Sequence, residues 1–136
     1  MQFMTRRRVT ALWVLPIVLA GFFLSQSQAA DPSSAATAYF AGGCFWCMEE
    51  AFEKVPGVTA VVSGYMGGRV ENPSYEQVSA GGTGHAESVE VVYDPAKVNY
   101  ATLLDAFWHN VDPVTPNAEF CDHGSQYRAV IFFQGE

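Results

Sequence analysis

Cysteine, histidine and basic residues are all scarce in this sequence, and each shortage counts against a class of protein. Among 136 residues there are three cysteines, three histidines and seven lysines or arginines, against fourteen acidic residues. A zinc site that includes Cys44 and Cys47 would need a second CxxC pair or paired histidines, and the histidines are scattered. An odd cysteine count leaves at least one thiol without a partner in the chain, which disfavours a purely structural disulfide framework.

The few basic residues are also unevenly distributed. Three of the seven lie in the first thirty positions, so the remainder of the chain carries a net charge of 4 − 14 = −10. A surface this acidic repels phosphate groups. We therefore expect neither nucleic acid nor an anionic membrane surface as a partner.

Residues 1–30 have the layout of a secretory signal peptide. Three arginines precede an uncharged apolar run from Val9 to Leu24, and small residues follow it. The run is shorter than the roughly 20 residues of a membrane-spanning helix, and it contains Pro16. We expect export to the periplasm or the outside, with cleavage after Ala29 or Ala30; an uncleaved leader would tether the protein to the membrane. A small, polar linker is expected at residues 31–37.

Residues 38–136 suit a single domain. Apolar and β-branched runs predict strands at 38–41, 58–65, 90–93 and 129–133, and helical spacing predicts helices at 48–55 and 100–110. The order β-α-β-β-α-β indicates an α+β, ferredoxin-like sandwich, with an antiparallel or mixed sheet and both helices on one face. Residues 69–87 are expected to form a long loop. Because the chain stops directly after the last strand, we expect the C-terminal part of the domain to be missing.

The stretch GGCFWC carries the clearest chemical signal. Cys44 follows a glycine turn and precedes a helix, where free amide N–H groups and the helix dipole favour a thiolate. Cys47 lies one turn later, within reach of a disulfide. Four interpretations compete: a thioredoxin-like redox pair, half of a zinc site, a structural disulfide, and a cysteine nucleophile beside an aromatic pocket.

Residues elsewhere favour the nucleophile. The motif GTGHAE places Glu87 just before a strand, and a carboxyl in a cleft lined by Phe45 and Trp46 would have its pKa raised by desolvation. Such a group can donate a proton near neutral pH. Tyr65 and Tyr127 stand at expected strand ends, from which their hydroxyls can donate into the same cleft.

Five successive blocks resemble the A-type peptide methionine-sulfoxide reductases, which act on the S epimer of the sulfoxide. The blocks run in order between about Tyr39 and Glu136, and they read GCFWCMEEAFEKVPGV, SGYMGGRVENPSYEQV, GTGHAESVEVVYDP, FWHNVDP and FCDHGSQYRAVIFF. The family has a ferredoxin-like core. The resemblance thus agrees with the fold expected from the order of elements.

The resemblance implies a role for each matching residue. Cys44 would be the nucleophile, Glu87 the acid, and Tyr65 and Tyr127 the hydroxyls that hold the sulfoxide oxygen. Asp122 would be a supporting carboxylate, and Phe45 and Trp46 would hold the substrate methyl group.

The resemblance also implies a reaction without a metal or an organic cofactor. A sulfenic acid on Cys44 would condense with a second thiol, and a thioredoxin-like donor would reduce the resulting disulfide. Cys47 is the first candidate for that thiol and Cys121 the alternative. Oxidised proteins or free methionine sulfoxide would be the substrates, and we expect a monomer.

Two other classes of function stay open. A general thiol–disulfide oxidoreductase would use Cys44 and Cys47 without needing Glu87. A sulfoxide-binding or structural domain would show no turnover at all.

Overall fold

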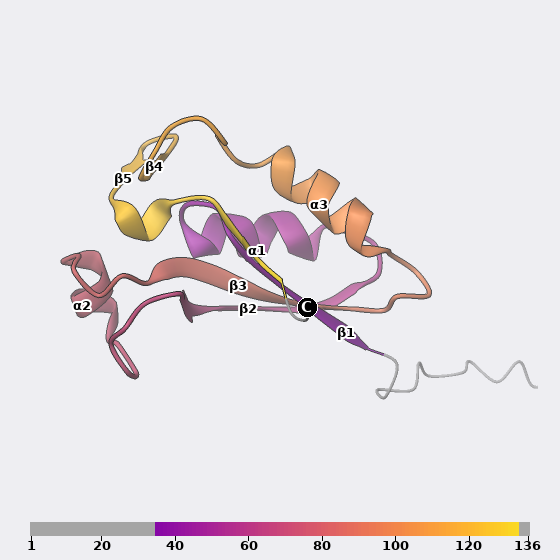
Figure 1. Ribbon diagram of the computed structural model, residues 1–136. Helices are drawn as coiled ribbons and strands as arrows, with labels where there is room; N and C mark the ends of the chain where they lie inside the picture. Colours follow the sequence, from indigo (N-terminus) through magenta and orange to yellow (C-terminus); the bar gives the residue numbers. More distant parts are fainter. Residues whose placement is uncertain (1–34, 134–136) are drawn as a thin grey trace, which may run out of the picture.

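The computed structural model describes residues 35–133, drawn in colour in Figure 1. The expected signal peptide and most of the expected linker lie outside the described residues. The described part has an α+β fold with an antiparallel four-stranded sheet. Its main elements are β1 (Ala36–Ala41), α1 (Phe45–Glu53), β2 (Val58–Met66), β3 (Ala86–Tyr93), α3 (Tyr100–Trp108) and β6 (Val130–Phe132).

The main strands and helices follow one another in the predicted β-α-β-β-α-β order. The strand order in the sheet is β2-β3-β1-β6, and each pair of neighbours is antiparallel. Figure 1 shows α1 and α3 on the same side of the sheet. The first strand begins at Ala36, two residues before the predicted start, and pairs with β3 from that residue.

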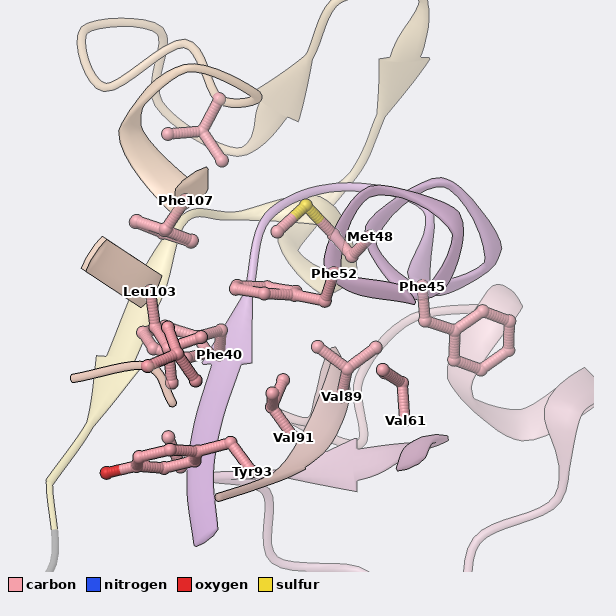
Figure 2. Packing of buried hydrophobic residues seen from close by; sticks show 13 residues of the cluster. Phe40, Phe45, Met48, Phe52, Val61, Val89, Val91, Tyr93, Leu103 and Phe107 are labelled. Atoms are coloured by element: carbon pink, nitrogen blue, oxygen red, sulfur yellow. The ribbon is translucent and has the colours of Figure 1, made fainter. Parts of the chain in front are cut away.

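The core lies between this helical layer and the sheet (Figure 2). The ring of Phe40 in β1 stacks on Phe52 of α1, with centroids 4.9 Å apart, and on Phe107 of α3, with centroids 5.4 Å apart. Met48 and Phe52 are four residues apart and therefore share the buried face of α1. Each fully buried side chain of this kind stabilises the fold by roughly 1.5–3 kcal/mol, so these contacts fix α1 on the sheet.

The start of strand β3 differs from the prediction. β3 begins at Ala86 rather than Glu90, so Glu87 is a strand residue and not part of the preceding loop. Residues 86–88 pair with β2 through Gly64, Tyr65 and Met66. Glu87 and Ser88 interrupt the apolar pattern of this strand, which is why the pattern alone placed its start too late.

The segment expected to be an uninterrupted loop contains a short helix, α2 (Tyr75–Ser79). Ser74 and Gln77 form a capping box: the Gln77 N–H donates to Ser74 Oγ at 3.3 Å, and the Ser74 N–H donates to Gln77 Oε1 at 2.8 Å. The prediction was wrong here because a helix of this length shows no sustained period.

The polar stretch before the last strand is also structured. It forms a hairpin of β4 (Ala118–Glu119) and β5 (Asp122–His123), followed by a 3₁₀ helix, η2 (Ser125–Tyr127). Tyr127 therefore lies in η2, not at a strand end. Figure 1 shows α2, the hairpin and η2 gathered at the end of the molecule where α1 begins.

None of the helices in residues 35–133 combines the length and the hydropathy needed to cross a bilayer.

Candidate active site around Cys44

Cys44 is the residue that precedes α1, as predicted from the sequence. Its carbonyl accepts hydrogen bonds from the N–H groups of Cys47 at 3.0 Å and Met48 at 3.2 Å, which begins the helix. Its side chain makes no capping hydrogen bond to the helix. The half-buried sulfur thus lies at the helix N-terminus, where the dipole favours an anion.

Glu87 lies directly beside this helix start. Its Oε2 accepts a hydrogen bond from the Phe45 N–H at 3.1 Å, and only 2% of the residue is exposed. Burial raises the pKa of Glu87, the Phe45 N–H opposes the rise, and the charge of Asp122 adds to it. A first-turn amide of α1 therefore holds the carboxyl next to the nucleophile, and burial keeps its pKa above the usual range of a glutamate.

Two of the predicted tyrosines lie near this carboxyl. Tyr65 is the direct partner of Glu87 across the β2–β3 pair, and its ring lies 5.6 Å from that of Phe45. Burial first, and then the charge of Glu87, raises the pKa of Tyr65 and likewise that of Tyr127. Both phenols therefore keep their protons at neutral pH and can act as hydrogen-bond donors.

Tyr75 is a third tyrosine of the site, and it was not predicted. Its ring stacks on that of Trp46, with centroids 6.2 Å apart and planes 20° apart. Its charge would also raise the pKa of both Tyr65 and Tyr127, which places it close to them. The sequence does carry a signal for it: the capping pair Ser74 and Gln77 marks a helix start, and Tyr75 is its first residue.

The predicted aromatic wall consists of an inner and an outer part. Phe45 is buried, with 6% of its surface exposed, whereas Trp46 is 61% exposed. The two rings lie 5.2 Å apart in a tilted arrangement. Phe45 therefore borders the carboxyl, and Trp46 forms the outer rim together with Tyr75.

Cys47 and Asp122 share with Cys44 the lining of a pocket of about 260 Å³. The residues that line it are Gly42, Cys44, Cys47, Met48, Asn110, Glu119, Phe120 and Asp122. Desolvation raises the pKa of Cys47, and so do the charge of Cys44 and a hydrogen bond between the two side chains. The Cys47 thiol thus holds its proton beside the Cys44 sulfur.

Cys121 occupies a different place from the other two cysteines. It is exposed in the turn of the β4–β5 hairpin, and it is not one of the residues that line the pocket. All three cysteines are free thiols in the structure.

Two side chains hold the segment that leads into β3. The His85 ring accepts the Gly68 N–H at Nδ1, at 3.2 Å, and donates from Nε2 to the Val70 carbonyl, at 2.8 Å. Arg128 donates to the carbonyls of Gly84 at 3.0 Å, His85 at 3.3 Å and Ser125 at 2.6 Å. Arg128 therefore ties the segment before Glu87 to η2, which carries Tyr127.

Within residues 35–133, no three histidine, cysteine or acidic side chains come together in a way that could hold a metal ion.

A free cysteine at a helix N-terminus, a buried carboxyl and several tyrosine hydroxyls define a cysteine-based site on an α+β fold. Residues 36–136 match the family model described as "Peptide methionine sulfoxide reductase". The chain belongs to this family, and the resemblance predicted from its sequence blocks is confirmed.

Similar proteins and structures agree with this assignment. The peptide methionine sulfoxide reductase MsrA of Limosilactobacillus reuteri is 50% identical over 74% of this chain and 57% of its own length. The peptide methionine sulfoxide reductase MsrA of Methanoculleus marisnigri is 55% identical over 76% of this chain and 63% of its own length. Methionine sulfoxide reductase A of Corynebacterium diphtheriae superposes with a TM-score of 0.73 at 37% identity, over 78% of this chain and 50% of that one. Mxr1 from Saccharomyces cerevisiae, in its reduced form, superposes with a TM-score of 0.72 at 30% identity, over 81% of this chain and 65% of that one. The chain thus spans about three fifths of the length of the curated relatives it matches.

Proposed function

We propose that this chain reduces the S epimer of methionine sulfoxide, both in proteins and as the free amino acid, to methionine. The hydrogen bond from the Phe45 N–H to Glu87 is the observation that carries the proposal. It holds a buried carboxyl of raised pKa beside Cys44, so a proton donor and a nucleophile meet at one place. A simple dithiol exchange would not need that carboxyl.

In the first half of the reaction, the Cys44 thiolate attacks the sulfoxide sulfur. That sulfur is a poor electrophile until its oxygen is protonated or strongly hydrogen-bonded, and Glu87 donates the proton. Tyr65 and Tyr127, with the newly located Tyr75, donate hydrogen bonds to the same oxygen. The oxygen leaves with Cys44 as a sulfenic acid, and methionine is released.

The choice of epimer follows from the aromatic side of the site. Phe45 and Trp46 form an apolar wall that takes the substrate methyl group. When the tyrosines hold the oxygen and the methyl group lies on the wall, only one configuration at sulfur leaves the sulfur atom open to attack by Cys44. The exposed position of Trp46 leaves room for a peptide beyond the methionine side chain.

In the second half of the reaction, a second thiol reduces the sulfenic acid and a disulfide forms. We propose Cys47 for this role because it lies one helical turn from Cys44 and lines the same pocket, whereas Cys121 lies outside that pocket. A thioredoxin-like protein then reduces the disulfide. Asp122 supports the site through its charge, which acts on Glu87 and Tyr127.

We further propose that the fold is of the ferredoxin-like class and that the protein works after export, as a monomer that repairs oxidised proteins. The strand order and the two helices on one side of the sheet support the fold assignment. The layout of residues 1–30 supports export, and the net acidic charge disfavours phosphate-rich partners.

One observation favours a second candidate, a general thiol–disulfide oxidoreductase: Cys44 and Cys47 are free thiols that line the same pocket. The two functions differ in their need for Glu87. Reduction of a blocked (S)-methionine sulfoxide, driven by dithiothreitol, should be abolished by Cys44→Ser, slowed at least about a hundredfold by Glu87→Gln, and left intact by the exposed control Glu53→Gln. Insulin reduction that persists in Glu87→Gln while sulfoxide reduction is absent from the wild type would support the second candidate.

A further inference from the structure

Glu119 is a second buried acid beside Cys44, in addition to Glu87. It lies in β4, opposite Asp122, and only 3% of the residue is exposed. Nothing in the polar stretch around it distinguishes it in the sequence from a solvated acid. The fold alone reveals its burial.

The contacts of Glu119 tie the hairpin to the residue before the nucleophile. A Cβ atom added to Gly43 would lie 2.5 Å from the Glu119 Cγ, so this carboxyl side chain packs directly on the glycine turn. The Asp112 N–H donates to Oε1. Oε2 is buried and has no hydrogen-bond partner among residues 35–133.

A buried carboxyl oxygen without a partner is costly, and such groups are rare in native structures unless they have a role. Glu119 lines the same pocket as Cys44 and Cys47, and Glu87 does not. Burial raises the pKa of Glu119, the Asp112 N–H opposes the rise, and the Asp112 charge adds to it. The residue is thus suited to exchange a proton within the pocket where the two thiols meet.

We propose that Glu119 transfers a proton in the second half of the reaction, from the Cys47 thiol to the hydroxyl group that leaves Cys44. This step rests on the proposed function and on Cys47 as the second thiol. Cys47 needs a base because its thiol keeps its proton near Cys44, and the departing hydroxide needs an acid. One carboxyl can serve both needs in turn.

The step balances without any further reactant. Cys44–SOH and Cys47–SH yield the Cys44–Cys47 disulfide and one water: an S–S bond forms, and the S–O and S–H bonds break. The Cys44 sulfur gains one electron and the Cys47 sulfur loses one. Glu119 takes up the thiol proton and returns it to the leaving oxygen, so it ends in its starting state.

The test forms the sulfenic acid without any sulfoxide. The reduced full-length chain is treated with hydrogen peroxide and quenched over time with dimedone and a maleimide, and peptide mapping by mass spectrometry counts the Cys44 adduct and the disulfide. In Glu119→Gln we expect disulfide formation about a hundredfold slower, with the dimedone adduct accumulating on Cys44. Glu53→Gln, which removes an exposed acid from α1, should behave as the wild type.

Several results would overturn the proposal: disulfide formation at the wild-type rate in Glu119→Gln, a larger delay in Asp122→Asn, or a disulfide to Cys121. If Glu119→Gln does not fold, the rate of disulfide formation in the wild type is compared in H₂O and D₂O. A proton transferred in this step makes the reaction slower in D₂O. Equal rates in the two solvents would contradict the step. Since peroxide bypasses the substrate, release of methionine from (S)-methionine sulfoxide in a single turnover reports on the proposed function separately.

Discussion

Glu87 and Tyr65 face each other across the β2–β3 pair, and the Phe45 N–H holds the carboxyl in place at 3.1 Å. A strand register thus sets the distance between an acid and a phenol, and a helix N-terminus sets the distance between the acid and Cys44. Neither spacing depends on a flexible loop. The acid and the nucleophile are therefore held in position before a substrate binds.

Replacing Glu87 by Gln should lower kcat for sulfoxide reduction by about 10²–10⁴, the usual contribution of a positioned acid. Gln keeps an oxygen that can accept the Phe45 N–H, so the fold should be retained. Kinetics with dithiothreitol, together with urea unfolding, check both parts. A variant that keeps more than half of the wild-type activity would remove Glu87 from the mechanism.

The raised pKa of Glu87 also predicts how stability changes with pH. The folded chain holds the proton of Glu87 at pH values where the unfolded chain has lost it. The contribution of Glu87 to the free energy of unfolding is therefore fully present below the unfolded pKa of about 4.3 and is lost as the pH rises through the folded pKa. The stability of the wild type relative to Glu87→Gln should therefore fall as the pH rises above the unfolded pKa. Urea unfolding at several pH values measures the difference in free energy of unfolding, with Glu53→Gln as the control for the loss of one acid. A difference that grows with pH would contradict the assigned shift.

Replacing Cys47 by Ser should separate the two halves of the reaction. The variant should still release about one methionine per chain in a single turnover, because Cys44 alone performs the first half, but it should not recycle with thioredoxin. Rapid quench and chromatography give the released methionine. Normal recycling would move the second role to Cys121 or to an external thiol.

The hydroxyl of Tyr75 should contribute to catalysis although the sequence did not single it out. Tyr75→Phe keeps the stacking on Trp46 and removes one donor, so kcat should fall by about tenfold; this is less than for a sole donor, because other tyrosines remain. Tyr100→Phe, a change on α3, serves as the matched control. Equal kcat values for the two variants would show that Tyr75 acts only through its ring.

Two glycine substitutions test how the segment before Glu87 is held. A Cβ atom on Gly68 would lie 2.1 Å from the His85 ring, whereas one on Gly64 would meet nothing within 4 Å. Gly68→Ala should lower the free energy of unfolding by about 1–3 kcal/mol and reduce activity, because both the ring and the backbone nitrogen of His85 must move. Gly64→Ala should change stability by less than about 0.5 kcal/mol. Urea unfolding of the pair is the measurement, and equal effects would contradict the account.

The sequence predicted the parts of the fold and site that local pattern determines. The order of the main elements followed from hydrophobic period, and Cys44 was placed correctly because a glycine turn and an amphipathic helix flank it. The sequence pattern missed the full extent of β3, the short α2 and the β4–β5 hairpin. Strand pairing and helix capping determine these elements, and the spacing of apolar residues does not reveal them. Glu119 and Tyr75 were missed for the same reason: each belongs to a polar segment whose position only the folded chain defines.

The most direct test of the central claim follows the two epimers of a racemic blocked methionine sulfoxide separately by chromatography, with the full chain and dithiothreitol. We predict that the S epimer disappears, that the R epimer remains, and that Cys44→Ser abolishes the loss. Consumption of both epimers at equal rates, or of the S epimer by Cys44→Ser as well, would contradict the account.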